Sequence, residues 1–325
     1  MHNWLASIEK QWYHKPTWVK CFTPVEYLFT TVALARKILY KKYAYTSTIP
    51  VWIVGNISVG GNGKTPFVAE LATRIQEQGY QVMVISHGYR SQCKHRVTIC
   101  APDSDPVRYG DEAVLLANLL QKSVVVAKKR AAAVRYIEKH YPETRVILCD
   151  DGLQHYQLGR DKEVVLIDKS RLGNQRCLPV GPLREPMSRL EQADLCLYRH
   201  AGAHSDIRYD ISHFHHLSSQ QVIAKDKFPF TRVHAVAGIA NPEHFFQSLE
   251  ALGVEVIRHR FPDHHRFKPE DCAFSDNIPV LMTTKDAVKC EAFTGENCYA
   301  VIMRLSLSAH AHTQINALIA SLGTC

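Results

Sequence analysis

Residues that suit phosphate binding are grouped in one short segment of this 325-residue chain, Ser58-Val59-Gly60-Gly61-Asn62-Gly63-Lys64-Thr65. Glycines let backbone N–H groups approach phosphate oxygens, a lysine reaches the outer phosphates, and a threonine hydroxyl can bind a metal ion. The usual pattern has glycine where Ser58 stands, so a chance glycine-rich turn is the alternative. An apolar run precedes the segment and Pro66 suits the first turn of a helix after it, which favours a phosphate-binding loop for ATP.

Two carboxylates, Asp150 and Asp151, follow the apolar run at residues 146–149. In folds with a phosphate-binding loop, a carboxylate at the end of a neighbouring strand positions Mg²⁺ opposite the loop threonine. We therefore expect Thr65 and Asp150 to hold Mg²⁺, while the sequence leaves open which aspartate contacts the ion directly. A strand that ends in Asp-Asp is also common as a solvated turn, and only the loop upstream favours the metal role.

Other polar clusters are weaker signals. Asp111 stands at the start of a helical pattern, where aspartate is also the ordinary capping residue. A rigid loop exposes Arg184 beside Glu185, which could be surface decoration. The stretches 213–216 and 259–265 are rich in histidine but lack a clear third or fourth ligand, so histidines in turns and at strand edges are favoured over a metal site.

Strands and helices alternate around these groups. Strands are expected at residues 50–54, 81–86, 124–127, 145–149 and 164–168, and helices at 67–78, 111–120 and 131–140. Strands separated by helices of this length are typical of βαβ units. The expected fold class is therefore α/β, with a mainly parallel sheet like that of P-loop NTPases and helices on both faces.

A second, smaller α/β unit is expected after a loosely placed linker between residues 213 and 231. Its strands are expected at 233–237, 254–259, 280–283 and 300–305, with a helix at 242–252. The predicted division is residues 1–48, 49–225 and 226–325. A cleft between the two α/β units would be a natural place for two substrates to meet.

The N-terminal 48 residues combine aromatic side chains with an amphipathic helical pattern, whose apolar members include Val25, Leu28, Phe29, Val32 and Leu39. The longest uncharged stretch is far shorter than the roughly 20 apolar residues that span a bilayer. With the basic cluster at residues 36–42, the pattern fits a helix in the headgroup region of an anionic membrane. It fits equally a helix that packs on the protein's own core.

Composition narrows the class of protein further. With 46% hydrophobic and 22% charged residues the chain is an ordinary globular one and not disordered. Its net charge of +8 favours an anionic partner, whether phosphate, acidic lipid or nucleic acid. The ten cysteines form no C-x-x-C pair and no signal peptide is visible, so we expect a reducing cytosolic setting without disulfides.

Taken together, these motifs resemble the tetraacyldisaccharide 4'-kinase family, the lipid A 4'-kinases of Gram-negative envelope synthesis, in which serine or threonine commonly stands at the position of Ser58. The motifs run in order from about residue 50 to 289: 55–66, His87-Gly88-Tyr89-Arg90, 110–113, 150–155, 181–186, 237–242, Asp263-His264 and Thr284-Lys285-Asp286-Ala287. Each piece is short, but the combination is specific. One departure is His87, where the family more often has arginine, and this leaves open whether the position supplies a fixed positive charge.

The resemblance implies ATP-dependent phosphorylation, with Mg²⁺, of the 4'-hydroxyl of a tetraacylated glucosamine disaccharide 1-phosphate. It implies Asp111 as base with His264 as its partner, Glu185 on the metal, and a set of substrate-binding residues, Asp151, Gln154, His155 and Arg184. It also implies a peripheral enzyme on the cytoplasmic face of the inner membrane, because the acyl chains stay in the bilayer and the N-terminal helix can reach them. The expected partners are the glycolipid and an anionic membrane surface, with no nucleic acid and no obligate protein partner.

Two rival classes make different predictions. A P-loop GTPase or metallochaperone-type switch predicts a guanine-reading N-K-x-D segment, and the nearest match, Thr284-Lys285-Asp286, lacks the asparagine. A non-catalytic nucleotide-binding scaffold at the membrane predicts that Asp111 can be replaced without loss of function.

Overall fold

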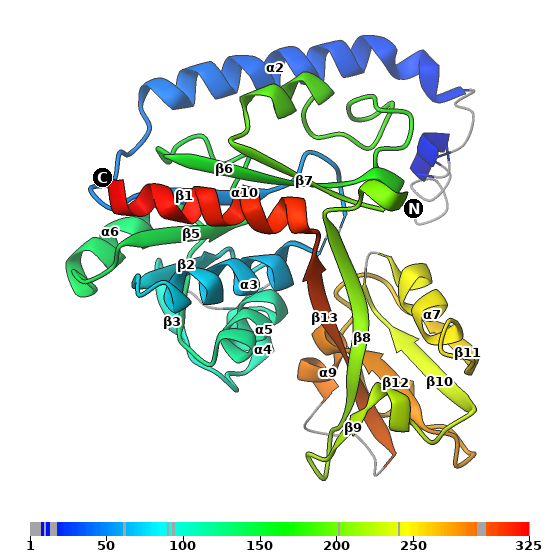
Figure 1. Cartoon of the computed structure of the whole chain (residues 1–325). Coiled ribbons are helices and arrows are strands. Elements are labelled where there is room, and N and C mark those ends of the chain that lie inside the picture. Colours follow the sequence, from blue (N-terminus) through cyan, green and yellow to red (C-terminus); the bar gives the residue numbers. More distant parts are fainter. Residues whose placement is uncertain are drawn as a thin grey trace.

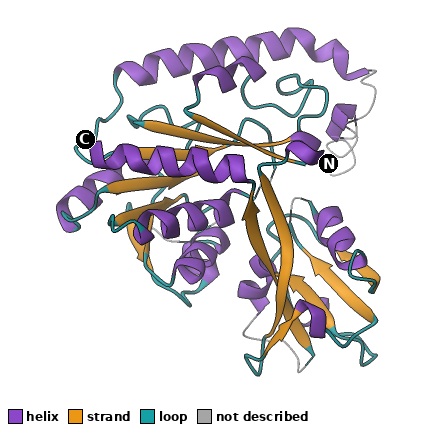
Figure 2. Ribbon diagram, viewed as in Figure 1, coloured by secondary structure: helices purple, strands orange, loops and turns teal. Residues whose placement is uncertain are grey.

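A single mixed sheet runs through the whole protein in the computed structural model, which describes residues 8–9, 11–13, 18–60, 63–89, 91–92, 95–200, 202–239, 241–290 and 297–324. The strand order is β11-β10-β12-β13-β8-β7-β6-β1-β5-β2-β4-β3, with β9 paired to β8 (Figure 1). Two units share this sheet and lie at an angle to each other, joined by two long strands (Figure 2).

The first unit is built on parallel strands, with one antiparallel edge strand, β3. Its strands are β1 (Val51–Gly55), β2 (Val82–Ser86), β3 (Thr98–Cys100), β4 (Val124–Val126), β5 (Val146–Asp150), β6 (Lys162–Asp168) and β7 (Leu195–Arg199). Its helices are α3 (Lys64–Glu77), α4 (Pro106–Tyr109), α5 (Asp111–Leu120) and α6 (Arg130–His140). Apolar residues of α3 and α5 pack on one face of the sheet and those of α6 on the other, as the α/β prediction expects.

The second unit is connected to the first by β8 (Ile207–His216) and β13 (Cys298–Leu307), which pair in antiparallel fashion along their length. The remaining elements are β9 (Val222–Ala224), β10 (Arg232–Ala237), β11 (Glu255–Arg260), β12 (Val280–Thr283), α7 (Pro242–Glu250), α8 (Pro269–Cys272) and α9 (Thr284–Cys290). Two apolar clusters form its own core. Part of the predicted linker is therefore regular structure, because β8 and β9 occupy much of residues 207–224.

The last helix, α10 (Ala309–Ala320), returns to the first unit. Its buried residues Ala311, Ile315 and Ile319 belong to the same apolar cluster as α3 and α5, and Figure 1 shows the helix lying beside the first unit. The division of the chain at residues 48 and 225 stays a prediction. The C-terminal helix packs on the first unit, although it follows the second unit in the chain.

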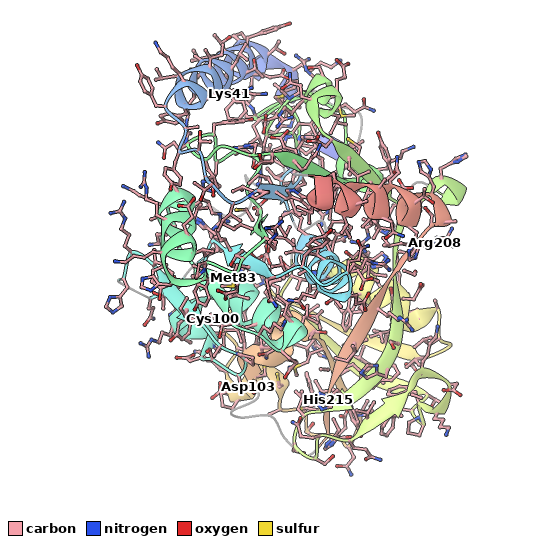
Figure 3. The ribbon with its side chains drawn as sticks, turned by 60° about the vertical axis from the view of Figure 1, so that its left-hand side comes forward. Lys41, Met83, Cys100, Asp103, Arg208 and His215 are labelled. Carbon is pink, nitrogen blue, oxygen red and sulfur yellow. The ribbon has the colours of Figure 1, made fainter. Side chains whose placement is uncertain are left out.

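The helix α2 (Thr23–Lys42) spans the edge of the first unit, at the opposite end of the protein from His215 of β8 (Figure 3). Its inward face is held by Glu26, which is buried, accepts a hydrogen bond from the backbone N–H of Cys177 (2.8 Å) and pairs with Arg176 (2.6 Å). Short 3₁₀ helices complete the structure: Trp18–Phe22, Lys169–Arg171, Met187–Gln192, Gly202–His204, Lys225–Lys227 and Ser321–Thr324.

The outward face of α2 is apolar. The exposed side chains on and beside it include Val25, Tyr27, Leu28, Val32, Leu34, Ile38, Leu39 and Tyr43. Of the residues predicted to share one face, Phe29 differs, because it turns inward and packs on the core of the first unit. No helix in the described part of the chain is long and apolar enough to cross a membrane.

Candidate active site

The phosphate-binding loop connects β1 to α3 at the carboxyl edge of the sheet. Gly60 and Gly63 have positive φ angles of 94° and 71°, a conformation that favours glycine. The carbonyl of Gly63 accepts a hydrogen bond from the Tyr209 hydroxyl at 2.6 Å, and a Cβ atom on this glycine would stand 2.9 Å from the Tyr209 ring. The loop is also held by the segment at residues 181–186, because the backbone N–H of Val59 donates to the carbonyl of Pro182 at 2.9 Å. Gly61 and Asn62 lie outside the described residues.

Lys64 and Thr65, the first residues of α3, contact the two aspartates predicted from the sequence. The Lys64 ammonium lies 3.4 Å from Asp151 Oδ1, and the Thr65 hydroxyl donates to Asp150 Oδ2 at 3.2 Å. Burial, followed by the nearby charge of Glu112, raises the pKa of Asp150 to about 7. The other oxygen of Asp150 is buried and has no hydrogen-bond partner among the described residues.

Asp151, in contrast, is held ionised. Its burial alone would raise its pKa, but the charges of Lys64 and Arg184 outweigh burial and lower the pKa to about 2. Arg184 Nη1 stands 3.5 Å from Asp151 Oδ2 and 3.5 Å from Gln154 Oε1. Three of the predicted substrate residues therefore meet beside Lys64.

Glu185, predicted on the metal, is engaged elsewhere. Its two oxygens accept hydrogen bonds from Gln154 Nε2 (2.9 Å) and from the Tyr156 hydroxyl, and Arg189 Nε lies 3.2 Å away. A metal role would require these contacts to rearrange, so it stays a prediction.

His155, the fourth predicted substrate residue, lies against His87, with ring centroids 5.6 Å apart. Burial, followed by the charge of Arg130, lowers the pKa of His155 to about 4, and the same two causes lower the pKa of His87. His87 therefore supplies no fixed positive charge at neutral pH. The cation with the largest effect on both histidines is the buried Arg130. Its guanidinium donates hydrogen bonds to the carbonyls of Asp150 (2.5 Å) and Ala127 (3.1 Å).

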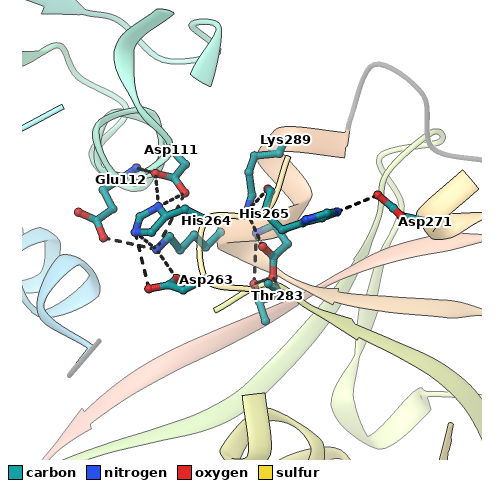
Figure 4. A network of polar contacts seen from close by, with 11 residues as sticks. Asp111, Glu112, Asp263, His264, His265, Asp271, Thr283 and Lys289 are labelled. Carbon is teal, nitrogen blue, oxygen red and sulfur yellow. Dashed lines mark hydrogen bonds and ion pairs between the residues drawn. The ribbon is translucent and has the colours of Figure 1, made fainter. Parts of the chain in front are cut away.

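Asp111 and His264 come together from the two units (Figure 4). Asp111 is the first residue of α5, and His264 lies in a turn of the second unit with a φ of 59°. His264 Nδ1 is 2.9 Å from Asp111 Oδ2 and 3.2 Å from Oδ1. Burial would raise the pKa of Asp111, but the hydrogen bond from His264 and the charge of Lys285 outweigh it and lower the pKa. The carboxylate is thus ionised at neutral pH.

Lys285 is a site residue to which the sequence assigned no role. Its Nζ lies 3.4 Å from Glu112 Oε1, 3.4 Å from Asp263 Oδ1 and 3.3 Å from His264 Nε2. The segment Thr284-Lys285-Asp286 was recognised as a motif. Its spacing does not predict that Lys285 contacts Asp111 and Glu112, which are more than 170 residues earlier in the chain.

Comparisons with known proteins show the family of the chain. A family model described as tetraacyldisaccharide-1-P 4'-kinase matches residues 18–321. The tetraacyldisaccharide 4'-kinase of Nitrosococcus oceani is 40% identical over 98% of this chain and 96% of its own length. That of Methylobacillus flagellatus is 42% identical over 89% of each.

Among solved structures, the chain is similar to LpxK from Aquifex aeolicus, crystallised in complex with ATP. The TM-score is 0.77 at 27% identity, and the match covers 93% of this chain and 99% of that one. The α/β fold predicted from the sequence is thereby confirmed.

Proposed function

This chain belongs to the tetraacyldisaccharide-1-P 4'-kinase family, and on that premise we propose that it transfers the γ-phosphate of ATP to the 4'-hydroxyl of a tetraacyldisaccharide 1-phosphate. The family inferred from the sequence motifs is confirmed, and with it a phosphotransferase that uses an alcohol acceptor. The assignments of individual residues that follow are part of the proposal.

The contact between Asp111 and His264 is the observation that best supports this mechanism. An ionised, buried carboxylate is a suitable acceptor for the proton of the sugar hydroxyl, and the imidazole fixes its orientation. As the 4'-oxygen forms a bond to the γ-phosphorus, its proton passes to Asp111. The bond from the γ-phosphorus to the bridging oxygen breaks, and ADP leaves with that electron pair.

The donor phosphates belong in the loop from Ser58 to Thr65. Helix α3 begins at Lys64 at this edge of the sheet, and the first N–H groups of a helix favour a bound anion. Lys64 is presented between Asn56 Oδ1 (3.2 Å) and Asp151 Oδ1 (3.4 Å), which aims its charge at the same place.

Thr65 and Asp150 fit the Mg²⁺ that accompanies ATP. Their oxygens are hard donors of the kind that Mg²⁺ prefers, and one buried oxygen of Asp150 lacks a hydrogen-bond partner among the described residues. When bound, the ion would neutralise charge on the phosphates. Between the two aspartates we favour Asp150, because Asp151 is already paired with Lys64 and Arg184.

The acceptor sugar would lie between the P-loop and the second unit, against Asp151, Gln154, His155 and Arg184. Arg184 and Gln154 contact each other, and the neutral His155 offers an uncharged donor or acceptor to a sugar hydroxyl. These groups come from the segment after β5 and from the loop at residues 181–186, so the carboxyl edge of the sheet presents them together.

The acyl chains would stay in the bilayer while α2 rests on it. The outward face of α2 carries Leu28, Val32 and Leu39, all more than half exposed, next to the basic residues Lys41 and Lys42. Apolar side chains with adjacent cations are typical of a helix in the interface of an anionic leaflet. The proposed location is therefore peripheral, on the cytoplasmic face of the inner membrane.

A micelle assay tests the function. Purified protein is given radiolabelled ATP, Mg²⁺ and the tetraacyldisaccharide 1-phosphate, and transfer to the glycolipid is compared among wild type, Lys64→Ala and Asp111→Asn. We expect transfer by the wild type and a loss of at least about 100-fold in Asp111→Asn, in the range typical of general base catalysis. Full activity in Asp111→Asn would contradict the mechanism, and an inactive wild type would contradict the function.

A further inference from the structure

Lys285 lies close to both residues of the Asp111–His264 contact. We propose that Lys285 is a positioning residue that fixes the tautomer of His264 and thereby keeps Asp111 available as the proton acceptor. This inference rests on the proposed kinase function, and it adds to it a residue with a defined physical role.

The contacts of Lys285 are close and come from both units, because Asp111 and Glu112 belong to the first unit and Asp263 and His264 to the second. Its Nζ lies 3.3 Å from His264 Nε2, 3.9 Å from Asp111 Oδ2, and 3.4 Å from both Glu112 and Asp263. The side chain is largely buried, and the charges of four carboxylates, Glu112, Asp111, Asp263 and Asp286, outweigh burial and raise the pKa of Lys285. The side chain is therefore an ammonium group at the pH where the enzyme works.

An ammonium group decides where the proton of His264 sits. It has three N–H donors and no acceptor, so a hydrogen bond to His264 Nε2 requires that nitrogen to accept. The proton of the neutral ring must then be on Nδ1, which faces Asp111 at 2.9 Å and 3.2 Å and donates to it. Asp263 Oδ2 lies 3.7 Å from Nε2, too far to compete as a hydrogen-bond acceptor for a proton there.

The same cation opposes the charged form of the ring. An imidazolium at His264 would place two positive charges 3.3 Å apart. In the described part of the chain, the groups that face the ring include Asp111 on α5, Asp263 in its own turn, Lys285 on α9, and the ring of Tyr89 after β2, whose centroid is 4.8 Å away. Among these described groups, loss of Lys285 would leave the carboxylates as the charged neighbours of the ring, and carboxylates favour the imidazolium.

The tautomer matters for the reaction. A neutral His264 that donates from Nδ1 holds Asp111 in place, yet it leaves the carboxylate basic enough to take a proton. An imidazolium would bind the carboxylate more tightly and weaken it as a base. The opposite neutral tautomer would turn a nitrogen lone pair toward the carboxylate and lose the hydrogen bond.

A purely structural role makes different predictions. In that case Lys285 would only hold the second unit against α5 by offsetting the charges of Asp111, Glu112 and Asp263. Its loss would then lower stability and all activity alike, with no dependence on His264. Lys285→Met, Lys285→Arg and the matched control Lys139→Met, an exposed lysine on α6, separate the two roles.

The first measurement is the ¹⁵N NMR shifts of the histidine ring nitrogens at neutral pH in the full-length enzyme without substrates, with His264→Ala as the assignment standard. These shifts distinguish a proton on Nδ1 from a proton on Nε2. We expect the His264 proton on Nδ1 in the wild type and in Lys139→Met, and a changed proton distribution in Lys285→Met, because the cation that keeps Nε2 an acceptor is removed. We expect Lys285→Arg to change it less. A wild-type proton on Nε2, or an unchanged pattern in Lys285→Met, would overturn the inference.

The second measurement is a kinetic cycle in the micelle assay. Lys285→Met should lower kcat by about tenfold or more, leave KM for ATP unchanged, and move the acidic limb of the pH profile. In the His264→Ala background the same substitution should cost little, because its effect acts through the ring. An equal loss in both backgrounds overturns the inference and leaves the kinase function intact. An inactive wild type would refute the function, while the ¹⁵N shifts of His264 would still decide the tautomer.

Discussion

Replacing apolar residues on the outward face of α2 should release the protein from membranes without unfolding it. The change is a triple variant, Leu28→Ser, Val32→Ser and Leu39→Ser. These side chains are 64%, 54% and 56% exposed, so their substitution removes little contact with the rest of the protein. The ion pair and backbone hydrogen bond of Glu26 on the inward face stay in place.

The size of the effect follows from the exposed fractions. Burying a whole Leu or Val side chain stabilises by about 1.5–3 kcal/mol. Slightly more than half of each of these three side chains is free to be buried in the membrane, so together they contribute about 3 kcal/mol to binding when the lower value is used. That free energy corresponds to about a 100-fold loss in the partition coefficient, since about 1.4 kcal/mol is a factor of ten.

Vesicle flotation measures this directly, with vesicles made of zwitterionic and anionic lipid. The matched control is Val107→Ser, Leu119→Ser and Val222→Ser, three residues off α2 that are 48%, 44% and 60% exposed. We expect the control to float with the wild type and the α2 variant to stay in solution. If the α2 variant floats as well as the control, the membrane role of this helix is refuted.

Three further predictions concern stability and the loop. Because burial lowers the pKa of His155 to about 4, its neutral form is favoured in the folded state, and stability is present at neutral pH and lost as pH falls from about 6.5 to 4. His155→Gln should lose less stability over that window in pH-dependent urea unfolding, and an identical loss would contradict the shift. Arg189→Met should cost about 3–5 kcal/mol in urea unfolding, because it removes the cation shared by two buried carboxylates, Glu163 (2.5 Å) and Glu185 (3.2 Å), of which Glu163 alone keeps a second arginine partner. Losing under 1 kcal/mol would refute that pairing. Gly63→Ala should raise KM for ATP while stability changes little, because φ is positive and the new Cβ meets Tyr209; an unchanged KM would refute the loop geometry.

The elements of the first unit were predictable because local signals agree with the final packing. The helix predicted at residues 111–120 is found with those bounds, since Gly110 adopts a positive φ just before it and an apolar stripe follows. The strands that end in the loop and in Asp150 were visible as short apolar runs, and the parallel sheet brings their carboxyl ends together.

Other features depend on contacts distant in the chain, which periodicity does not show. The apolar stripe of α10 does not show which unit the helix packs on. The helix reaches the first unit because β13 runs antiparallel to β8 and so returns the chain to it. Glu26 was visible only as a charge beside an apolar stretch, yet it is buried against residues 176 and 177. In the same way the contacts of Lys285 could not be predicted, because they form only where the second unit packs against α5.

The most direct test of the account is the structure of the product. Wild-type protein is incubated with ATP, Mg²⁺ and the tetraacyldisaccharide 1-phosphate, and the glycolipid is isolated for ³¹P NMR and mass spectrometry. The account predicts one added phosphomonoester, located on the 4'-oxygen, in a reaction that Asp111→Asn abolishes. A product phosphorylated at another position, or ATP consumed with no phosphate on the lipid, would contradict it.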